Sequence, residues 1–441
     1  MKDPKAHPTR AFRAAILHSL ANPTDVGLED SYQYFDDGML LVADGHIVNV
    51  GHAEDILPML DASIEVVELD DKLIMPGFID THIHYPQTGM IAAYGDQLID
   101  WLNNYTFPEE RRFEDDDYAR DVAVHFLDEL ARNGTTTALV FGTVHKSSVD
   151  VFFQEAEKRN LRMIAGKVLM DRNAPDDLTD TPESGYADSK ALIEKWHNKG
   201  RLHYAITPRF APTSSSEQLR LAGKLRQEYP DVYLHTHLSE NPKEIEWVAE
   251  LFPDSKNYLD VYDSHGLLSN RSVFAHGIHL CEQECARLAE TDSAIAFCPT
   301  SNLFLGSGLF PLSKMEQSGI KVGMGTDVGA GTSFSLLQTM SEAYKVMQLQ
   351  GEKLHPLKSL YQATLGGAKA LSLDNDIGNL EVGKEADFVV IDLHATQLMK
   401  FRMEHAESLE DKLFVLMTLG DDRAVFDTYS YGQSVYPVNN S

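Results

Sequence analysis

Apolar and polar positions alternate in two different ways along this chain of 441 residues. In its middle part, short apolar runs typical of strands are separated by stretches in which apolar residues recur at helical spacing. One such stretch, 118–133, places Ala119, Phe126 and Leu130 on one face and ends at Asn133-Gly134, a typical helix stop. The strand candidates are 78–84, 137–142, 162–170, 203–210, 232–238, 272–279, 294–299 and 322–327.

The middle of the chain therefore predicts repeated strand and helix units. Eight such units in about 250 residues are what a closed barrel of parallel strands requires. We predict an α/β fold with a TIM-like (β/α)8 barrel over residues 75–379. In such barrels the functional side chains lie where the strands end, so the polar residues that finish each strand become the site candidates.

The two ends of the chain have another pattern, with short apolar runs and turn signals. Near the N-terminus, runs at 39–43 and 46–50 flank Asp44-Gly45, which is a hairpin signal. Near the C-terminus, runs at 386–392 and 424–426 precede a turn at Gly432. We predict that the two ends pair as one small discontinuous β-sandwich domain, formed by residues 11–74 and 380–437.

Residue types that bind metals stand at the ends of several predicted strands. His82 and His84 are two residues apart, so a strand places both imidazoles on one face. His237 lies near the end of the fifth strand and Asp327 is the last residue of the eighth. Nitrogen and carboxylate ligands without thiolate suit Zn²⁺ or Fe²⁺, with one coordination position left for water. Together with His276 at the end of the sixth strand, these residues are the candidate ligands, and they predict a metal centre at the mouth of the barrel.

Two further polar residues belong to the same strand ends. Glu240, three residues after His237, can carry protons between a water and a substrate, although an acid there would also stabilise the N-terminus of the following helix. His276 could be a fourth ligand, a core histidine or a hydrogen-bond partner of an attacking water, and we favour the last. His235 and His279 are expected to have supporting or structural roles.

Composition narrows the class of protein. The chain has 67 acidic against 38 basic residues, a formal net charge of -29, which argues against nucleic acid and anionic membranes as partners. Three cysteines are too few for a disulfide framework, and no apolar run approaches the roughly 20 residues of a membrane span. We expect a cytoplasmic protein that acts on a small neutral or weakly charged molecule.

Several motifs resemble a known family. The combination of PGFIDTHIH, HTHLSE, FAHG and GMGTD is similar to the amidohydrolase superfamily, in its mononuclear branch of aminohydrolases. Longer segments resemble the guanine deaminase family within that branch, over residues 12–436. The segments are HYPQ at 84–87, AYGDQLIDWLNNYTFPEE at 93–110, GTTTALVFGTVH at 134–145, GKVLMDRNAPD at 166–176 and TPRFAPTSS at 207–215.

The resemblance implies one zinc ion per chain, with Fe²⁺ as the alternative, held by His82, His84, His237 and Asp327. It implies guanine and water as the reactants, xanthine and ammonia as the products, and a homodimer. Two-metal members of the superfamily use a carbamylated lysine on the fourth strand. Because Lys167 falls on the third predicted strand, we expect a single metal ion.

The resemblance also implies roles in hydrolytic deamination. Asp327 would accept a proton from the attacking water, Glu240 would protonate N3 of the ring, and His276 would stabilise the developing oxyanion. The implied purine-binding residues are Gln87, Arg209, Phe210, His237, Glu240 and Asp327.

The purine contacts have their own logic. Arg209 only donates hydrogen bonds, so it would favour the carbonyl O6 of guanine over the amino group of adenine. Phe210 is expected either to cover the ring or to pack in the core, and the long segment 101–112 is a candidate lid. Two alternatives stay open: an enzyme of the same branch acting on another purine, a pyrimidine or an amino-triazine, and a barrel that binds without catalysis.

Overall fold

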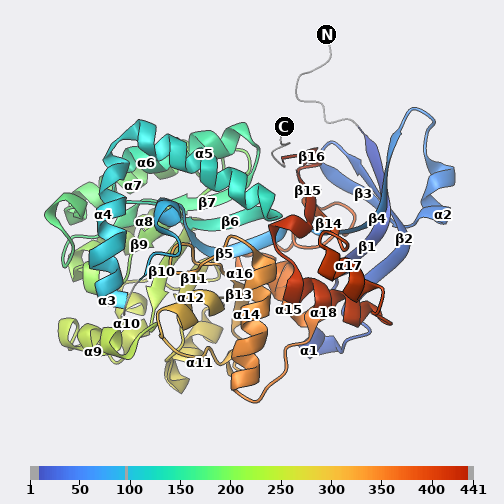
Figure 1. Cartoon of the computed structure of the whole chain (residues 1–441). Coiled ribbons are helices and arrows are strands. Elements are labelled where there is room, and N and C mark those ends of the chain that lie inside the picture. The colour runs from blue at the N-terminus through green and yellow to red at the C-terminus, as the bar shows by residue number, and fades with distance from the viewer. Residues whose placement is uncertain (1–8, 95–97, 436–441) are drawn as a thin grey trace, which may run out of the picture.

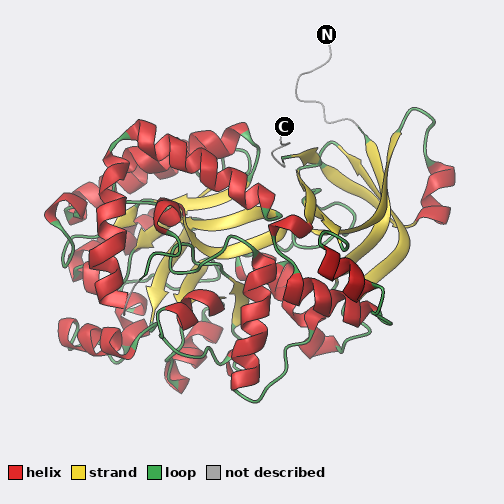
Figure 2. Cartoon of the chain, in the orientation of Figure 1, coloured by secondary structure: helices red, strands yellow, loops and turns green. Residues whose placement is uncertain are grey.

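The computed structural model describes residues 9–94 and 98–435. The predicted boundary at 437, the end of the resembling region at 436, and residues 95–97 of the segment 93–110 lie outside these ranges. Figure 1 shows a barrel surrounded by helices at one end of the molecule and a curved sheet at the other, and Figure 2 shows that helices are fewer around the sheet than around the barrel. Within the described ranges, no helix combines the length and apolar character that a membrane span requires.

The barrel contains the eight predicted parallel strands, in the order in which they occur along the chain. It closes where the last strand meets the first, because the amide of Asp327 donates to the carbonyl of His82 at 2.9 Å and the amide of His84 donates to Val328 at 2.9 Å. The strands are β5 (Phe78–His84), β6 (Thr135–Phe141), β7 (Arg162–Gly166), β9 (His203–Pro208), β10 (Tyr233–Leu238), β11 (Ser272–His276), β12 (Ala294–Phe297) and β13 (Lys321–Met324), with β8 (Val168–Leu169) paired to β9.

Helices cover the outside of the barrel, as the helical spacing predicts. The helix expected at 118–133 is α5 (Asp116–Arg132), in which the side chain of Asp115 caps the N-terminus and Ala119, Phe126 and Leu130 are buried. The others are α6 (Lys146–Lys158), α7 (Pro182–Trp196), α8 (Ser216–Glu228), α9 (Pro242–Leu251), α10 (Tyr258–Asp263), α11 (Glu282–Glu290), α12 (Pro299–Phe304), α13 (Leu312–Gln317), α14 (Leu336–Leu349), α15 (Pro356–Ala363) and α16 (Leu365–Ala370).

A second core fills the barrel interior. Small and apolar residues such as Leu139, Ile164 and Ala296 point inward, and the segment around α16 closes the N-terminal end of the barrel. The hydroxyl of Tyr233 donates to the carbonyl of Leu371 at 2.7 Å, so that the segment is tied to the strands. Only the carboxyl ends of the strands remain for a site.

The segment after β5 is long and mostly helical. It contains η2 (Tyr85–Met90), α3 (Leu98–Trp101), the π-helical turn η3 (Leu102–Thr106), α4 (Phe107–Glu110) and η4 (Arg111–Glu114). This stretch includes the predicted lid, 101–112, and it lies at the mouth of the barrel, where Trp101, Leu102 and Thr106 line a cavity.

Both ends of the chain form the separate sheet, which confirms the predicted fold class and the pairing of the two ends, although the strands are hydrogen-bonded as one sheet rather than as the two sheets of a sandwich. Its seven strands are hydrogen-bonded as one curved sheet, mostly antiparallel, with a parallel pair between β1 and β4. Phe12, Phe388 and Tyr429 pack ring against ring in its core. In spatial order the strands are β16 (Gln433–Ser434), β15 (Val425–Ser430), β14 (Phe388–Asp392), β4 (Glu65–Pro76), β1 (Arg10–Ser19), β2 (Tyr32–Ala43) and β3 (His46–His52).

Four short helices accompany the sheet. Two lie in the N-terminal part, α1 (Pro23–Val26) and α2 (Ala53–Ile56), and two lie between β14 and β15, α17 (Gln397–Met403) and α18 (Leu409–Leu419). The last of these packs against α14 and α15 of the barrel. The C-terminal segment therefore contributes to the barrel's surface as well as to the sheet.

Candidate active site

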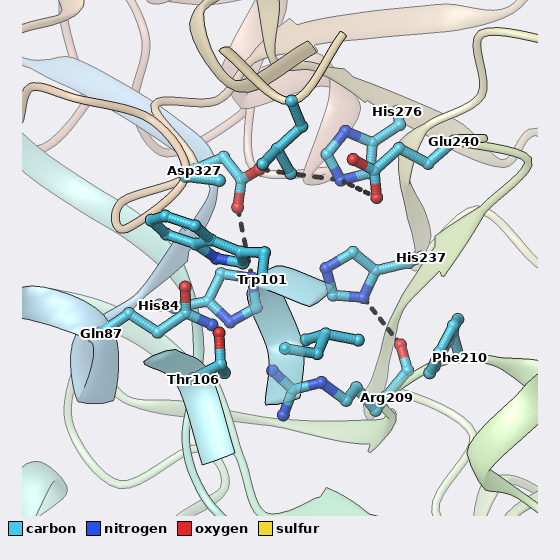
Figure 3. Close-up of a pocket in the computed structure, with 13 residues that line it drawn as sticks. His84, Gln87, Trp101, Thr106, Arg209, Phe210, His237, Glu240, His276 and Asp327 are labelled. Atoms are coloured by element: carbon cyan, nitrogen blue, oxygen red, sulfur yellow. Dashed lines mark hydrogen bonds and ion pairs between the residues drawn. The ribbon is translucent and has the colours of Figure 1, made fainter. Parts of the chain in front are cut away.

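A cavity with about 440 Å³ of empty space opens at the carboxyl ends of the barrel strands. Figure 3 shows its side chains converging from several strands, with Trp101 lying across the view. The residues lining the cavity are His84, Gln87, Trp101, Leu102, Thr106, Arg209, Phe210, His237, Glu240, His276, Leu305, Asp327 and Ala330.

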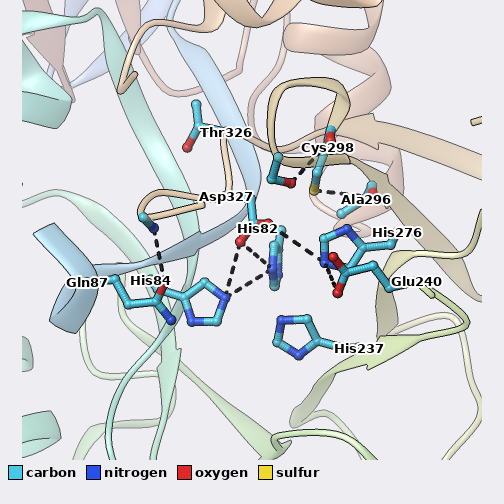
Figure 4. Close-up of polar contacts among 12 residues, drawn as sticks. His82, His84, Gln87, His237, Glu240, His276, Ala296, Cys298, Thr326 and Asp327 are labelled. Carbon is cyan, nitrogen blue, oxygen red and sulfur yellow. Dashed lines mark hydrogen bonds and ion pairs between the residues drawn. The ribbon is translucent and has the colours of Figure 1, made fainter. Parts of the chain in front are cut away.

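The four predicted metal ligands come together at one side of this cavity (Figure 4). Their ligand atoms all lie within 4.8 Å of one another. Oδ1 of Asp327 lies 3.1 Å from Nε2 of His82 and 3.3 Å from Nε2 of His84, and the two imidazole nitrogens are 3.2 Å apart. Ligand atoms about 2.0–2.1 Å from a tetrahedral Zn²⁺ would be separated by about 3.3 Å, so these spacings fit such an ion.

The neighbouring hydrogen bonds hold two of these imidazoles in the form that binds a metal. Nδ1–H of His237 donates to the carbonyl of Arg209 at 2.7 Å, which leaves Nε2 free to face the cluster. Nδ1 of His82 lies 2.7 Å from Nε2 of His235, so the predicted supporting role of His235 is to orient His82. Burial lowers the pKa of His84 to about 3 and the pKa of His237 well below its ordinary value. Neutral imidazoles are the metal-binding form.

Backbone conformation at the strand ends turns the site residues inward. His276 and Asp327 have φ of 73° and 52°, a left-handed region that residues other than glycine seldom adopt and that is frequent at functional sites. Asp327 lies three residues past the end of β13, in a loop rather than on the predicted strand. The buried carboxylate of Asp80 accepts from the amides of His82 and Thr326, both at 3.1 Å, and so links the two segments that carry the ligands.

Glu240 lies on the other side of the cluster, almost fully buried. Its Oε1 accepts a hydrogen bond from the hydroxyl of Ser307 at 3.0 Å, and its Oε2 lies 3.5 Å from Nε2 of His276. Burial, together with the charge of Asp327, raises the pKa of Glu240 to about 8. A carboxyl group that holds a proton near neutral pH is suited to proton transfer.

His276 lies between the two carboxylates. Its Nε2 is 3.5 Å from Glu240 and 3.7 Å from Oδ2 of Asp327, while its Nδ1 lies 2.9 Å from Oδ1 of Asn302. The amide oxygen only accepts, so Nδ1 carries a proton and Nε2 is directed into the cavity. This geometry suits the favoured role beside a water, which stays a prediction.

The predicted purine contacts line the opposite wall. Oε1 of Gln87 accepts from the amide of Gly329 at 3.2 Å, so its NH₂ group is the end left to donate. Phe210 lines the cavity and also packs against Trp247, with ring centroids 6.3 Å apart, so both roles considered for it are compatible with its position. Arg209 borders the cavity and forms a buried ion pair with Glu110.

Lys167 lies in the gap between β7 and β8, on the third barrel strand as counted from the sequence. It is fully buried and its Nζ lies 2.5 Å from Oδ2 of Asp180. It does not line the cavity, and it is not part of the cluster formed by His82, His84, His237 and Asp327. Its position supports the prediction of a single metal ion without testing it.

Some site residues were not singled out from the sequence. Trp101 and Thr106 line the cavity, Asn302 and Ser307 hold His276 and Glu240, and Glu110 pairs with Arg209. The segment 93–110, which resembles the family, contains Trp101, Thr106 and Glu110 and is the signal that could have identified them. Nothing in the sequence around Asn302 and Ser307 connects them with strands that lie far away in the chain.

Comparison with known proteins agrees with this geometry. The sequence profile of the Amidohydrolase family matches residues 73–435. Guanine deaminase of Escherichia coli K12 is 56% identical over 436 residues, which are 98% of this chain and 99% of that protein. The solved structure of E. coli guanine deaminase superimposes with a TM-score of 0.93 at 54% identity, over 98% of this chain and 99% of that one. Guanine deaminase of C. acetobutylicum, solved with bound guanine, has a TM-score of 0.88 at 31% identity, over 97% and 99%.

Proposed function

The chain belongs to the amidohydrolase family, among its guanine deaminases, and we propose that it hydrolyses guanine to xanthine and ammonia with the help of one bound metal ion. One observation carries this proposal. The cluster of His82, His84, His237 and Asp327 borders, through its last three members, the cavity that Glu240 and the donor side chains of Gln87 and Arg209 also line. A hydrolytic centre and a surface that recognises a purine are thus within reach of one small molecule.

The metal is proposed to be zinc, with Fe²⁺ as the alternative, held by His82, His84, His237 and Asp327. When bound, such an ion lowers the pKa of a water so that a hydroxide nucleophile is available near neutral pH. The protein's own contribution is to keep the three imidazoles neutral and the carboxylate ionised. Burial opposes ionisation of Asp327, but the neighbouring imidazole of His82, together with that of His84, holds its pKa well below the usual value.

Two carboxyl groups would move the protons. Asp327 would take a proton from the water as the water oxygen attacks C2 of guanine. Glu240, protonated near neutral pH, would give its proton to N3 and make C2 more electrophilic. Asp327 would then pass its proton to the amino group, the C2–N bond would break, ammonia would leave, and the hydroxyl proton of the new C2–O group would return to Glu240. His276, 3.5 Å from Glu240 and 3.7 Å from Asp327, would stabilise charge on the attacking oxygen.

Recognition of guanine rests on the donor groups of the opposite wall. Arg209 would donate to O6 and the NH₂ group of Gln87 would donate to another acceptor of the ring. Adenine presents an amino group in place of O6, which would leave the arginine donors unmatched. Such a polar mismatch discriminates strongly between related ligands. Phe210 supplies an apolar surface for the ring.

The remaining parts of the proposal concern the whole molecule. We propose a cytoplasmic homodimer whose barrel spans residues 75–379 and whose sheet domain spans 11–74 and 380–437. The three cysteines are free thiols, which supports a reducing compartment. Light scattering during size-exclusion chromatography tests the dimer, and a single monomeric peak would contradict it.

A substrate panel tests the function. Protein of known zinc and iron content is incubated with guanine, adenine, guanosine, cytosine and an amino-triazine, and released ammonia is measured. We expect ammonia from guanine and one metal equivalent per chain. Activity on a nucleoside or a triazine with none on guanine would overturn the proposed substrate, and two metal equivalents would overturn the single site.

A further inference from the structure

The most unusual contact in the cavity wall is the ion pair between Arg209 and Glu110. Nη1 of Arg209 lies 3.0 Å and 2.9 Å from the two oxygens of Glu110, and Nη2 lies 3.0 Å from Oε1. Both side chains are buried, with 4% and 0% of their surface exposed. The two residues come from different parts of the fold, because Glu110 ends α4 and Arg209 follows β9.

The pair uses only part of what the guanidinium offers. A guanidinium has five N–H groups in a plane, and Glu110 accepts from Nη1 and Nη2. In the described part of the chain, Nε has no acceptor. Nε–H and the outer N–H of Nη2 lie along one edge of the plane, so this edge is free for a ligand.

That edge borders the cavity. Arg209 is one of the lining residues, and Figure 3 shows its guanidinium between Thr106 and Phe210, on the same side as the amide of Gln87. The surroundings are otherwise apolar. The ring of Phe107 lies 5.7 Å from the guanidinium carbon, and Leu102 and Phe210 belong to one apolar cluster with Phe107.

A buried arginine in such surroundings needs a partner. Without one, an unpaired cation would be costly, and the long side chain could turn to other acceptors or to water. Glu110 removes both problems, because it neutralises the charge of Arg209 and fixes the plane of its guanidinium group. A guanidinium group that is already fixed loses little conformational entropy when a ligand binds. The pair also leaves the wall without net charge, which suits a neutral base.

We propose that Glu110 is a positioning residue for purine recognition, which acts through Arg209 and directs its free edge toward O6 of the base. This inference rests on the proposed function and deepens it. The same pair anchors α4 to the barrel, so a purely structural role is the competing explanation. The two roles differ in what a substitution changes: binding of the base in the first case, stability alone in the second.

The first test compares Glu110→Gln with Glu109→Gln. Glu109 is the preceding residue of α4, and its carboxylate bonds to Tyr118 and Arg112 away from the cavity wall. Hypoxanthine is the binding probe, because it carries O6 but has no amino group to lose. We expect E110Q to raise the KM for guanine and the Kd for hypoxanthine about 10–100-fold, with kcat within about threefold and metal content unchanged. We expect E109Q to match the wild type.

The second test is a double-substitution cycle. If Glu110 acts through Arg209, adding E110Q to Arg209→Ala should change the Kd for hypoxanthine by less than about threefold, although each single substitution weakens binding. Unsubstituted purine lacks O6 and should bind wild type and E110Q alike. If E110Q does not fold, Glu110→Asp gives the same comparison, because the shorter side chain keeps the charge but cannot hold the guanidinium of Arg209 in the same plane.

Three outcomes would overturn the inference. The first is an E110Q protein with a lower melting temperature but unchanged KM and Kd, which would leave only the structural role. The second is additive effects in the cycle. The third is a wild type that does not bind hypoxanthine. Failure of the proposed function looks different, because guanine would then release no ammonia while the effect of E110Q on hypoxanthine binding could still be measured.

Discussion

Each end of the barrel contains a buried arginine beside carboxylates, and the two are used differently. At the amino end, all the donor groups of Arg201 form hydrogen bonds within the protein. Their acceptors are Glu385, Asp387, Ser430 and the carbonyl of Asn160. At the carboxyl end, Arg209 bonds to Glu110 through Nη1 and Nη2 and keeps one edge for the cavity. A buried arginine whose donors are all bonded within the protein indicates a structural contact. One that keeps donors free toward a cavity indicates a binding site.

The amino end joins the two bodies of the molecule. Glu385 and Asp387 lead into β14 of the sheet, whereas Arg201 and Arg162 precede and begin barrel strands. Nη2 of Arg162 lies 2.5 Å from Oε1 of Glu385, and both its side chain and that of Arg201 are mostly buried. The cluster therefore fixes how the sheet and the barrel fit together, and nothing in it is left to meet a substrate.

The carboxyl end shows the opposite features. Glu240 and Asp327 are buried close to each other without a cationic lysine or arginine beside either of them among the described residues, and His276 and Asp327 adopt strained backbone conformations. Such an arrangement is unfavourable for folding alone, and it becomes favourable when a metal ion and a substrate complete it. The comparison predicts that substitutions at one end affect turnover and binding, while those at the other affect stability.

The largest effect is expected for Glu240→Gln. The amide keeps the shape and the bond to Ser307 but cannot carry a proton, so kcat should fall about 10²–10⁴-fold while metal content and melting temperature stay unchanged. Steady-state kinetics on metal-quantified protein measure this, with exposed Glu246→Gln on α9 as the control. A kcat within tenfold of the wild type would remove Glu240 from the mechanism.

At the amino end, Arg201→Ala should reduce the free energy of unfolding by about 3–5 kcal/mol, because it leaves Glu385 and Asp387 buried without their shared partner. Urea unfolding measures the loss. Arg220→Ala, which breaks an exposed pair with Glu217, should cost at most about 1 kcal/mol. The folded R201A protein should keep the wild-type KM for guanine, and a large rise in KM would contradict the division between the two ends.

The same cluster should weaken in acid through His203. Burial and the charge of Arg162, which donates to Nε2 at 3.2 Å, lower the pKa of His203 to about 3. Its ordinary pKa is about 6.5, so the unfolded chain takes up a proton first and stability is lost as pH falls below 6.5. At pH 5 the loss from this residue is about 2 kcal/mol. His203→Gln should reduce the difference in unfolding free energy between pH 7 and pH 5 by that amount, and an unchanged difference would contradict the assignment.

The sequence predicted the barrel because strand and helix patterns alternate regularly, and it predicted the metal cluster because ligands such as His82 and Asp327 stand at strand ends. Contacts between distant segments could not be predicted. Glu110 lies 99 residues from Arg209 and belongs to a run of charges that would ordinarily be exposed, yet it is fully buried. Helices α17 and α18 interrupt a C-terminal part with only strand signals, because their stability comes from packing: α18 packs against α14 and α15 of the barrel, and α17 packs against α18.

The smallest effect is expected for Ser307→Ala, which tests how the carboxyl end of the barrel orients Glu240. Ser307 donates to Oε1 of Glu240 at 3.0 Å and thereby leaves Oε2 toward His276 and the cavity. Ser307→Ala removes one hydrogen bond to a buried carboxyl group, so kcat should fall about 3–10-fold, while KM for guanine and metal content stay as in the wild type. Ser307→Thr keeps the hydroxyl and should recover most of the loss. If S307A and S307T are equally impaired, the loop position rather than the hydrogen bond is responsible, and the orientation of Glu240 does not depend on this serine.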